Sequence, residues 1–248
     1  MSGLFDRLFG KKMEHSNDSE KVICIFATYN IDGDDIRFIE ANKDYCTFVV
    51  IESLGAPSLF SMHIQSMNDV EYISRRNIGY DVTAWKEFIC SNFERLKTYD
   101  YVIIANNSCR YDFSIRDTIK DMKRKGATFY GLNYSWERAE HMQSYYNILD
   151  KSLVASDAFI KHWEDINGVS GREDAIVKHE LSFLQHMKAA GANVAYVTDY
   201  GVIKNGYEGS RYSPDMEKVP SFIKKKLLVM GTERTKYEQL LKTRPHMI

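Results

Sequence analysis

Residues 22–29, VICIFATY, form the stretch of the chain from which its fold is predicted. Nearly every side chain in this stretch is apolar or of a type that favours β-structure, which indicates a buried strand. The segment Asp32–Asp35 that follows is rich in turn-forming residues and predicts the start of a helix carrying Ile36, Phe38 and Ile39. A buried strand that leads directly into a helix is typical of a layered α/β domain.

Strands and helices alternate along the rest of the chain. Further strands are expected at Tyr45–Ile51, Val70–Ile73, Tyr101–Ala105, Thr128–Leu132, Tyr145–Leu149 and Val194–Thr198. Helices are expected at Thr83–Leu96, at Ser114–Lys125, after the capping residue Ser156, and at Arg172–Ala190, whereas Ser53–Asn68 is interpreted as irregular. This alternation predicts the α/β class, with a mostly parallel central sheet flanked by helices.

The composition excludes several classes of function. The chain has 248 residues, of which 44% are hydrophobic and 27% charged, as in an ordinary soluble globular protein. The 33 Lys and Arg residues against 34 Asp and Glu residues leave a formal net charge of −1. Such a balance provides no bulk attraction for nucleic acid, so no nucleic-acid partner is expected.

The cysteines indicate where the protein works. Cys24, Cys46, Cys90 and Cys109 lie far apart and form no C-x-x-C pair. We interpret them as free thiols in a reducing compartment, which predicts a cytoplasmic protein. No stretch approaches the roughly 18–20 apolar residues of a membrane span.

The N-terminal segment suggests contact with a surface. Leu4, Phe5, Leu8 and Phe9 fall on one stripe of a short helix, with charged residues on the other positions. This pattern suits a helix in the membrane interface, and it suits equally a terminus that docks on its own domain or on a partner. We therefore divide the chain into an amphipathic segment and linker at 1–20, a main domain at 21–227 and a C-terminal helical tail at 228–248. Peripheral attachment to the inner membrane is one interpretation.

Polar residues crowd the ends of the predicted strands. Thr28 ends the first strand, RRNIGYD at 75–81 follows the third, and NNSCRYD at 106–112 follows the fourth. Ligands of such sheets bind at the carboxyl ends of the strands. Asn, Gly, Asp, Ser and Arg side chains at these ends suit a nucleotide or polyol pocket. The chain lacks G-x-G-x-x-G, the P-loop, G-x-S-x-G and H-E-x-x-H, which disfavours the chemistries that those motifs serve.

Longer stretches resemble the rhamnan synthesis protein F family of bacterial polysaccharide glycosyltransferases. The similar pieces begin with RRNIGYDVTAWK at 75–86 and YDYVIIANNSC at 99–109, and they continue through residues 130–163 and 172–191. The resemblance covers roughly residues 22–225. It implies a GT-A-like fold and transfer of a sugar from a UDP- or dTDP-sugar to a hydroxyl of a lipid-linked or oligosaccharide acceptor. The expected products are O-antigen, other lipopolysaccharide or capsule.

The resemblance assigns donor binding to the strand ends. The expected donor-binding residues are Thr28, Asn77, Gly79, Asp81, Asn106, Asn107 and Ser108. From the residues alone, Asp81 would serve equally as a helix cap, and an ordinary turn is the preferred interpretation of Asn106–Ser108.

The segment Asn106–Ser108 also indicates whether the protein uses a metal cofactor. Asn106-Asn107-Ser108 stands where GT-A enzymes usually carry Asp-x-Asp, and hard cations prefer carboxylates to amides. No metal ligands are therefore assigned, and the cofactor stays unknown, with either metal-independent or weakly Mg- or Mn-dependent activity. Arg110, or the Lys and Arg residues of 205–226, are alternatives for neutralising the donor diphosphate.

Glu180 is the expected catalytic residue. It shares a predicted helix with Ile176, Phe183 and Leu184, and an apolar stripe would desolvate its carboxylate. Such a carboxylate suits a general base that takes the proton of an acceptor hydroxyl, which implies inversion, and Glu180 resembles the base of inverting GT-A enzymes by position. Asp174 and Glu173 are rival bases, and a surface glutamate paired with Lys178 or His179 is the alternative interpretation.

Acceptor binding is assigned to a separate stretch. His141, Gln143 and Ser144 precede an aromatic-rich strand and are expected to bind the acceptor. A function from another class remains open beside the enzyme, namely a non-catalytic carbohydrate- or nucleotide-binding module of a polysaccharide assembly complex. The missing Asp-x-Asp favours this alternative.

Overall fold

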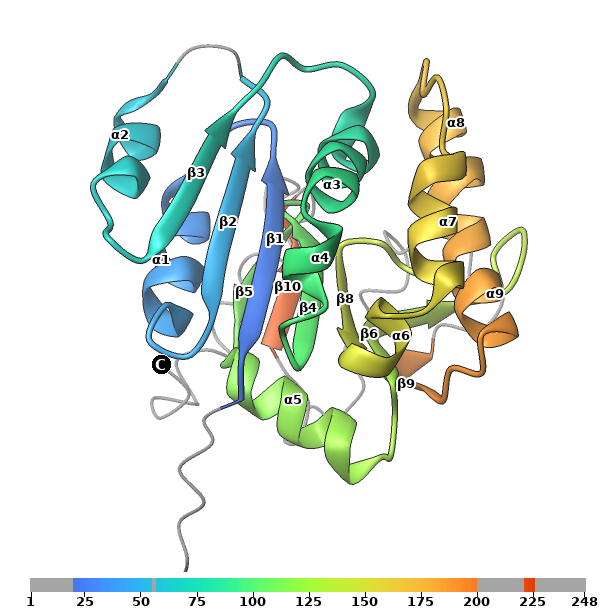
Figure 1. Ribbon diagram of the computed structural model, residues 1–248. Helices are drawn as coiled ribbons and strands as arrows, with labels where there is room; N and C mark the ends of the chain where they lie inside the picture. Colours follow the sequence, from blue (N-terminus) through green and yellow to red (C-terminus); the bar gives the residue numbers. More distant parts are fainter. Residues whose placement is uncertain (1–19, 55–56, 200–220, 226–248) are drawn as a thin grey trace, which may run out of the picture.

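The computed structural model describes residues 20–54, 57–199 and 221–225, which form a central sheet with helices on both faces (Figure 1). The strands of this sheet are β1 Val22–Thr28, β2 Thr47–Glu52, β3 Val70–Ser74, β4 Tyr101–Asn106, β6 Phe129–Ser135, β7 His141–Met142, β8 Tyr146–Asp150 and β9 Val194–Asp199. A second, two-stranded sheet pairs β5 Cys109–Asp112 with β10 Ser221–Lys224. The expected N-terminal segment, with Leu4, Phe5, Leu8 and Phe9, and the expected tail at 228–248 lie outside the described residues.

The strand directions confirm the predicted class. The order of the large sheet is β3-β2-β1-β4-β8-β6-β7, and β9 pairs with β6. Strands β1 to β4 are mutually parallel, β8 is antiparallel to both β4 and β6, and β9 is parallel to β6. All strands except β7 and β8 therefore run in one direction, so the sheet is mostly parallel and its carboxyl ends meet at one edge.

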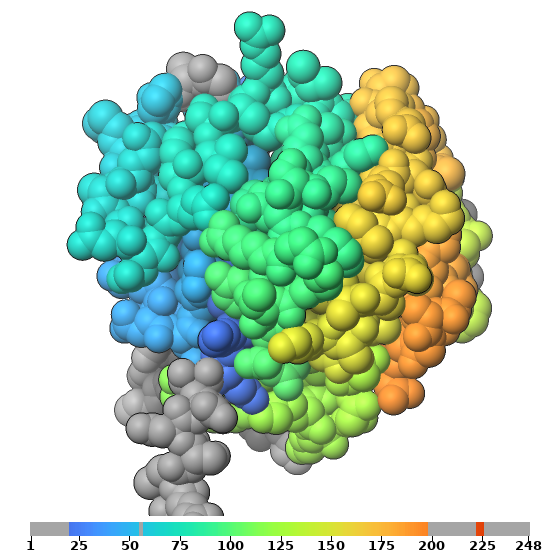
Figure 2. Space-filling model, in the orientation of Figure 1, coloured from blue at the N-terminus to red at the C-terminus, as the bar shows by residue number. Residues whose placement is uncertain are grey.

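Helices cover both faces of the sheet. They are α1 Gly33–Asn42, α2 Leu59–Gln65, α3 Tyr80–Ser91, α4 Phe93–Leu96, α5 Ile115–Arg124, α6 Lys151–Val154, α7 Asp157–Asp165, α8 Arg172–Ala175, the π-helical turn η1 Ile176–Glu180 and α9 Leu181–Ala189. One apolar core joins the sheet to α3, α7 and α9 around Trp85, Trp163 and Phe183. The other joins it to α1 and α5 through Phe38 and Met122. On the surface shown in Figure 2, α3 and α7 lie side by side.

Local sequence signals explain how several helices begin and end. Asp32 caps α1, where its carboxylate accepts from the backbone N–H groups of Asp34 and Asp35. Ser156 caps α7 through the N–H of Phe159, as expected. Gly126 follows α5 with a φ of 62°, a conformation that glycine adopts without steric cost. Cys24, Cys46, Cys90 and Cys109 are all free thiols, which confirms that prediction.

Three predicted segments differ from the structure. Ser53–Asn68 contains α2, whose start is fixed by reciprocal hydrogen bonds between Ser58 and Ser61. The expected helix Thr83–Leu96 begins earlier, at Tyr80, and ends at Ser91, where Asn92 separates it from the short α4. The expected helix Arg172–Ala190 is interrupted by η1, so its residues do not follow one α-helical period.

Within the described ranges, no helix is both long enough and apolar enough to cross a membrane.

Candidate active site

A cleft of about 620 Å³ opens where the polar strand ends meet. It is bounded by the start of α3, the end of β4, the connections around β7, the α8–η1 segment and the end of β10. The residues that line it are Tyr80, Asp81, Val82, Trp85, Asn106, Ser108, Glu137, Arg138, His141, Gln143, Ser144, Tyr145, Arg172, Ala175, Ile176, Glu180, Leu181, Lys224 and Lys225. The cleft thus brings the expected donor side and the expected acceptor side together.

Asp81 and Asn106 form a hydrogen-bonded pair on the donor side. The Asn106 amide donates to the Asp81 carboxylate at 2.8 Å, and its carbonyl oxygen accepts from the N–H of Ser108 at 3.0 Å. Burial raises the pKa of Asp81 to about 6, against the lowering effects of the Asn106 hydrogen bond and the Arg75 charge. The alternative in which Asp81 caps the helix is wrong, because the capping residue of α3 is Gly79 and no side chain caps it.

Gly79 has a backbone role that its neighbours explain. Its φ of 76° lies in the left-handed region, and a Cβ on it would stand 2.0 Å from the Thr83 hydroxyl. Only glycine fits this entry into α3 without moving Thr83. Gly79 positions Asp81, although it does not itself line the cleft.

Three other expected donor residues also lie outside the cleft lining. Thr28 is buried at the end of β1, and Asn77 is exposed on the loop before α3. Asn107 donates to the carbonyl of Asn30 at 3.0 Å and to the carboxylate of Asp35 at 3.3 Å, so it ties the turn after β4 to the start of α1. The donor role of Thr28, Asn77, Gly79 and Asn107 stays a prediction.

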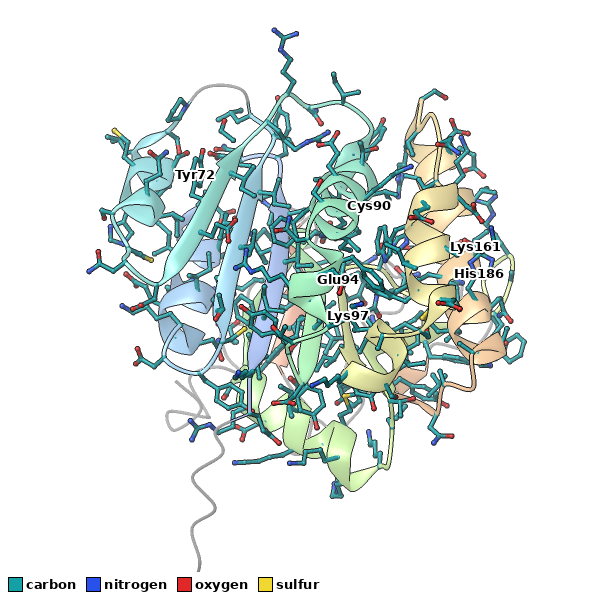
Figure 3. The ribbon with its side chains drawn as sticks, viewed as in Figure 1. Tyr72, Cys90, Glu94, Lys97, Lys161 and His186 are labelled. Carbon is teal, nitrogen blue, oxygen red and sulfur yellow. The ribbon has the colours of Figure 1, made fainter. Side chains whose placement is uncertain are left out.

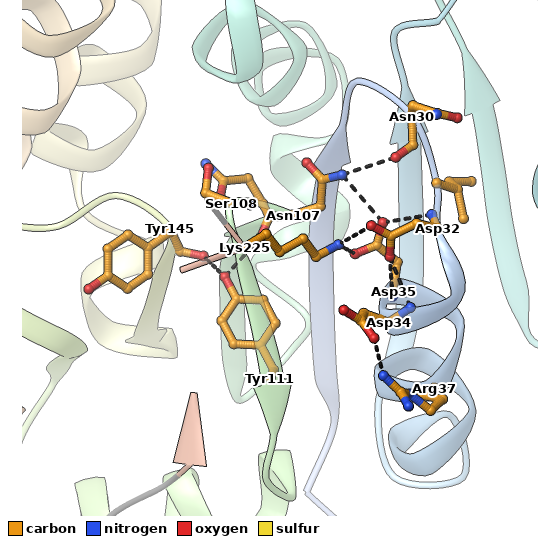
Figure 4. Close-up of polar contacts among 12 residues, drawn as sticks. Asn30, Asp32, Asp34, Asp35, Arg37, Asn107, Ser108, Tyr111, Tyr145 and Lys225 are labelled. Carbon is orange, nitrogen blue, oxygen red and sulfur yellow. Dashed lines mark hydrogen bonds and ion pairs between the residues drawn. The ribbon is translucent and has the colours of Figure 1, made fainter. Parts of the chain in front are cut away.

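Lys225 also contacts Asp35 at the start of α1 (Figure 4). Its ammonium lies 2.7 Å from Asp32 and 2.6 Å from Asp35, whose carboxyl is 1% exposed. Burial raises the pKa of Asp35 to about 6, while the charge of Lys225 acts in the opposite direction. The backbone N–H of Lys225 also donates to the Ser108 carbonyl at 2.9 Å. These contacts fix the end of β10 against the turn after β4.

Lys224 points to another part of the cleft. Its ammonium lies 3.4 Å from the Gln143 carbonyl oxygen and 5.0 Å from the centre of the Tyr145 ring. Lys224 is the last residue of β10 and Lys225 follows it, and the two lysines contact different groups. Arg110 pairs with Asp112 at 2.8 Å and does not line the cleft. Of the basic alternatives for the diphosphate that the structure describes, Lys224 and Lys225 line the cleft, whereas Arg211, Lys218 and Lys226 lie outside the described residues.

Glu180 lines the acceptor side. Its carboxylate accepts from the Ser144 hydroxyl at 2.8 Å and from the Ser144 N–H at 3.3 Å, and it stands 3.8 Å from Nε2 of His141. The expectation that Glu180 lies in an apolar stripe is wrong, because the π turn changes which residues of the segment face the core. His179 takes the buried position, and Glu180 faces polar groups.

The rival bases are engaged elsewhere. Asp174 accepts from the N–H of Ser170 at 3.0 Å and lies 3.7 Å from Lys178, and Glu173 pairs with Arg138. Neither of these carboxylates lines the cleft, whereas Glu180 does. The geometry therefore favours Glu180 among the three candidate bases, and its catalytic role stays a prediction.

The hydrogen bonds around His141 fix the orientation of its ring. Its Nδ1 lies 2.8 Å from the Ala139 carbonyl, which only accepts, so Nδ1 donates. Its Nε2 then accepts from the Gln143 amide at 2.8 Å, and the Gln143 carbonyl oxygen faces Lys224. His141 and Gln143 are both buried, and with Ser144 they form the wall beside Glu180.

Sequence reasoning did not identify several residues that line the cleft. Tyr80, Glu137, Arg138 and Arg172 line it, and the sequence assigned none of them a role. All four lie within the stretches that resemble the family, and Tyr80 also lies inside the polar run 75–81.

A chain of three histidines was also missed. The His162 ring nitrogens lie 2.9 Å from His186 and 3.0 Å from His179. His186 lies at the outer end of this chain, on α9 beside α7 (Figure 3). Burial lowers the pKa of His162 to about 2 and that of His179 to about 3, so both rings are neutral. Within the parts of the chain that the structure describes, no cluster of three or more His, Cys, Asp or Glu is arranged to hold a metal ion.

One curated protein is similar to part of this chain. A protein of Sinorhizobium fredii (strain NBRC 101917 / NGR234) described as uncharacterized protein y4gN is 21% identical over 128 residues. That match covers 50% of this chain and 33% of the relative, so the chain spans about a third of that protein.

Solved structures show distant similarity. A putative nucleotide-diphospho-sugar transferase from Desulfovibrio desulfuricans G20 aligns with a TM-score of 0.43 and 13% identity, over 79% of this chain and 90% of that one. The bifunctional glycosyltransferase WbbM aligns with a TM-score of 0.40 and 12% identity, over 65% of this chain and 37% of that one.

The family comparison covers most of the domain. The model described as rhamnan synthesis protein F matches residues 56–243, a range that includes α3, β4 and the α8–η1–α9 segment. The sheet order and strand directions agree with the GT-A-like α/β fold expected from the resemblance. This chain therefore belongs to the rhamnan synthesis protein F family.

Proposed function

We propose that this protein is a glycosyltransferase that moves a sugar from a nucleotide-diphosphate donor to a hydroxyl of a bacterial surface polysaccharide. The observation that carries the proposal is the cleft itself, which places Glu180 in the same cavity as Asp81, Asn106 and Lys224. One cavity thereby holds a carboxylate for proton transfer, polar groups for a sugar nucleotide and a cation for its diphosphate. The family supports the same reaction class.

The donor side suits a UDP- or dTDP-sugar. Asp81 and Asn106 present a carboxylate and an amide at the carboxyl edge of the sheet, where ligands of α/β folds bind. Lys224 reaches across the cleft toward Gln143 and Tyr145, so its ammonium is placed to contact a diphosphate between the two sides. An ammonium there stabilises the negative charge that develops on the leaving group.

The acceptor side suits a sugar hydroxyl. In the proposed step, the acceptor oxygen attacks the anomeric carbon of the donor while the bond from that carbon to the diphosphate oxygen breaks. The hydroxyl proton passes to the Glu180 carboxylate, and the electron pair of the broken bond leaves with the nucleoside diphosphate. A single displacement of this kind inverts the anomeric configuration. Ser144 orients the carboxylate by donating two hydrogen bonds to one of its oxygens, which leaves the other oxygen for the acceptor.

The kind of acceptor and the location in the cell are part of the same proposal. A lipid-linked glycan of O-antigen or capsule is the expected acceptor, which would place the protein on the cytoplasmic surface of the inner membrane. The alternative is a binding module without catalysis. It draws support from Asn106 and Ser108, which stand where a metal-dependent enzyme would carry the two carboxylates of Asp-x-Asp.

Hydrolysis of a panel of UDP- and dTDP-sugars without acceptor tests the proposal directly. We expect slow release of the nucleoside diphosphate from one donor and faster release when an oligosaccharide acceptor is added. The assay is run both with EDTA and with added Mg²⁺ or Mn²⁺, which measures metal dependence. Tight nucleotide binding without any hydrolysis or transfer would support the binding module instead.

A further inference from the structure

Two residues of the cleft have an unfavourable backbone conformation. Among the described residues, Tyr80 and Arg138 are the ones other than glycine with positive φ, at 61° and 68°. The left-handed region is sterically costly for a residue with a Cβ, and it is rare for large side chains. Both residues line the cleft, although they come from separate segments, the start of α3 and the connection from β6 to β7.

Core packing does not account for these conformations. Tyr80 is 48% exposed and the Arg138 side chain is 45% exposed, so neither is held in place by burial. The surrounding backbone imposes the conformations instead. The Thr83 N–H donates to the Gly79 carbonyl at 3.2 Å beside Tyr80, and the Ala139 N–H donates to the Glu137 carbonyl at 2.8 Å around Arg138. Strain that the fold maintains at exposed positions of a cleft points to a ligand.

We propose that Tyr80 and Arg138 form the binding subsite for the acceptor glycan. This inference rests on the proposed function and names the residues that hold its second substrate. The Tyr80 ring offers an apolar face on which a pyranose packs, and its hydroxyl offers a hydrogen bond at the edge. The Arg138 guanidinium offers a planar set of donors to sugar oxygens.

The neighbours of Arg138 fit a chain of several sugars. Arg138 pairs with Glu173, an exposed ion pair that a ligand displaces at little cost. Trp136, two residues before Arg138, is 49% exposed and contacts Tyr134 through its ring edge. Trp136 lies outside the cleft lining, so an acceptor bound at Tyr80 and Arg138 reaches its ring only by extending beyond the cleft, which favours an oligosaccharide over a monosaccharide.

Paired substitutions separate the strain from the side-chain contact. Tyr80→Ala and Arg138→Ala remove the side chains and retain the strained backbone, whereas Tyr80→Gly and Arg138→Gly also relieve the strain. We expect each Gly variant to melt about 2–4 °C above its Ala counterpart without ligand. All four variants should raise the KM for an oligosaccharide acceptor by about fivefold or more, which is a larger change than the one they cause in donor hydrolysis without acceptor. Arg124→Ala, which removes another exposed arginine with one carboxylate partner, is the matched control and should alter neither reaction.

The readouts distinguish this inference from the proposed function. If the wild-type protein hydrolyses no donor and transfers no sugar, the proposed function is wrong and the subsite is wrong with it. If donor hydrolysis and transfer proceed and the four variants keep a normal acceptor KM, the subsite alone is wrong. Equal melting temperatures of the Gly and Ala variants would overturn the argument from strain.

Discussion

Replacing Asp81 with asparagine should stabilise the protein at pH 8 and weaken donor binding at the same time. The asparagine keeps the size of the side chain, and its carbonyl oxygen still accepts from the Asn106 amide, which in the wild type donates at 2.8 Å to the carboxylate. The substitution removes only the charge. The stability change therefore reports the cost of holding an ionised carboxylate at this position.

The magnitude follows from the pKa. Burial raises the pKa of Asp81 from its ordinary value of 3.8 to about 6. A difference of this size corresponds to roughly 3 kcal/mol between the two protonation states. Above pH 6 the folded protein bears this cost, because the carboxylate is ionised in the folded and the unfolded state alike. Below pH 3.8 the carboxyl is protonated in both states and the cost is absent.

The sign of the pH dependence is therefore defined. Asp81→Asn should be more stable than the wild type by up to about 3 kcal/mol at pH 8, and this advantage should fall away as the pH drops from 6 to 4. Denaturant unfolding at a series of pH values measures it. Asp35 has a raised pKa as well, but it is unchanged in the variant and cancels from the difference.

Nucleotide binding supplies the second readout. Loss of the charged acceptor should weaken binding of the matching nucleoside diphosphate by about 1–3 kcal/mol in calorimetry. A stability difference that is constant between pH 4 and pH 8 would refute the argument from burial. Unchanged nucleotide affinity in the folded variant would remove Asp81 from the donor site.

Three further predictions concern other parts of the chain. Glu180→Gln should lower turnover by about 10²–10⁴-fold and change donor affinity by no more than a few-fold, whereas Asp174→Asn should remain active in a transfer assay. An active Glu180→Gln variant and an inactive Asp174→Asn variant would move the base to Asp174. Lys224→Met should weaken UDP or dTDP binding and reduce the salt dependence of that binding. Lys225→Met should chiefly lower the melting temperature, because it leaves the buried Asp35 carboxylate without its cation. Equal losses of nucleotide affinity in the two variants would contradict these separate roles. Deleting residues 1–12 should abolish binding to anionic liposomes in a flotation assay and leave the melting temperature nearly unchanged, and a large drop in melting temperature would place the segment in the core.

Local pattern predicted most of the regular structure because the responsible forces act between near neighbours. The apolar run at 22–29 formed the central strand β1, and Ser156 capped α7 as its type and position predict. The break in the helix Arg172–Ala190 was not predictable in this way. A π turn places Glu180 beside Ser144, and the apolar spacing of the segment is equally compatible with an uninterrupted helix.

The sequence by itself determined the α/β class and the polar strand ends. It also determined that Asp81 and Asn106 lie at the same edge of the sheet, because parallel strands bring their carboxyl ends to one edge whatever their order. Only the tertiary structure decided which polar residues share the cleft. Asn107 turns toward Asp35, and Lys224 arrives from β10 to lie 3.4 Å from Gln143, 81 residues away in the chain. Such contacts depend on the pairing of distant strands and on the direction of single side chains, and neither leaves a periodic signal in the sequence.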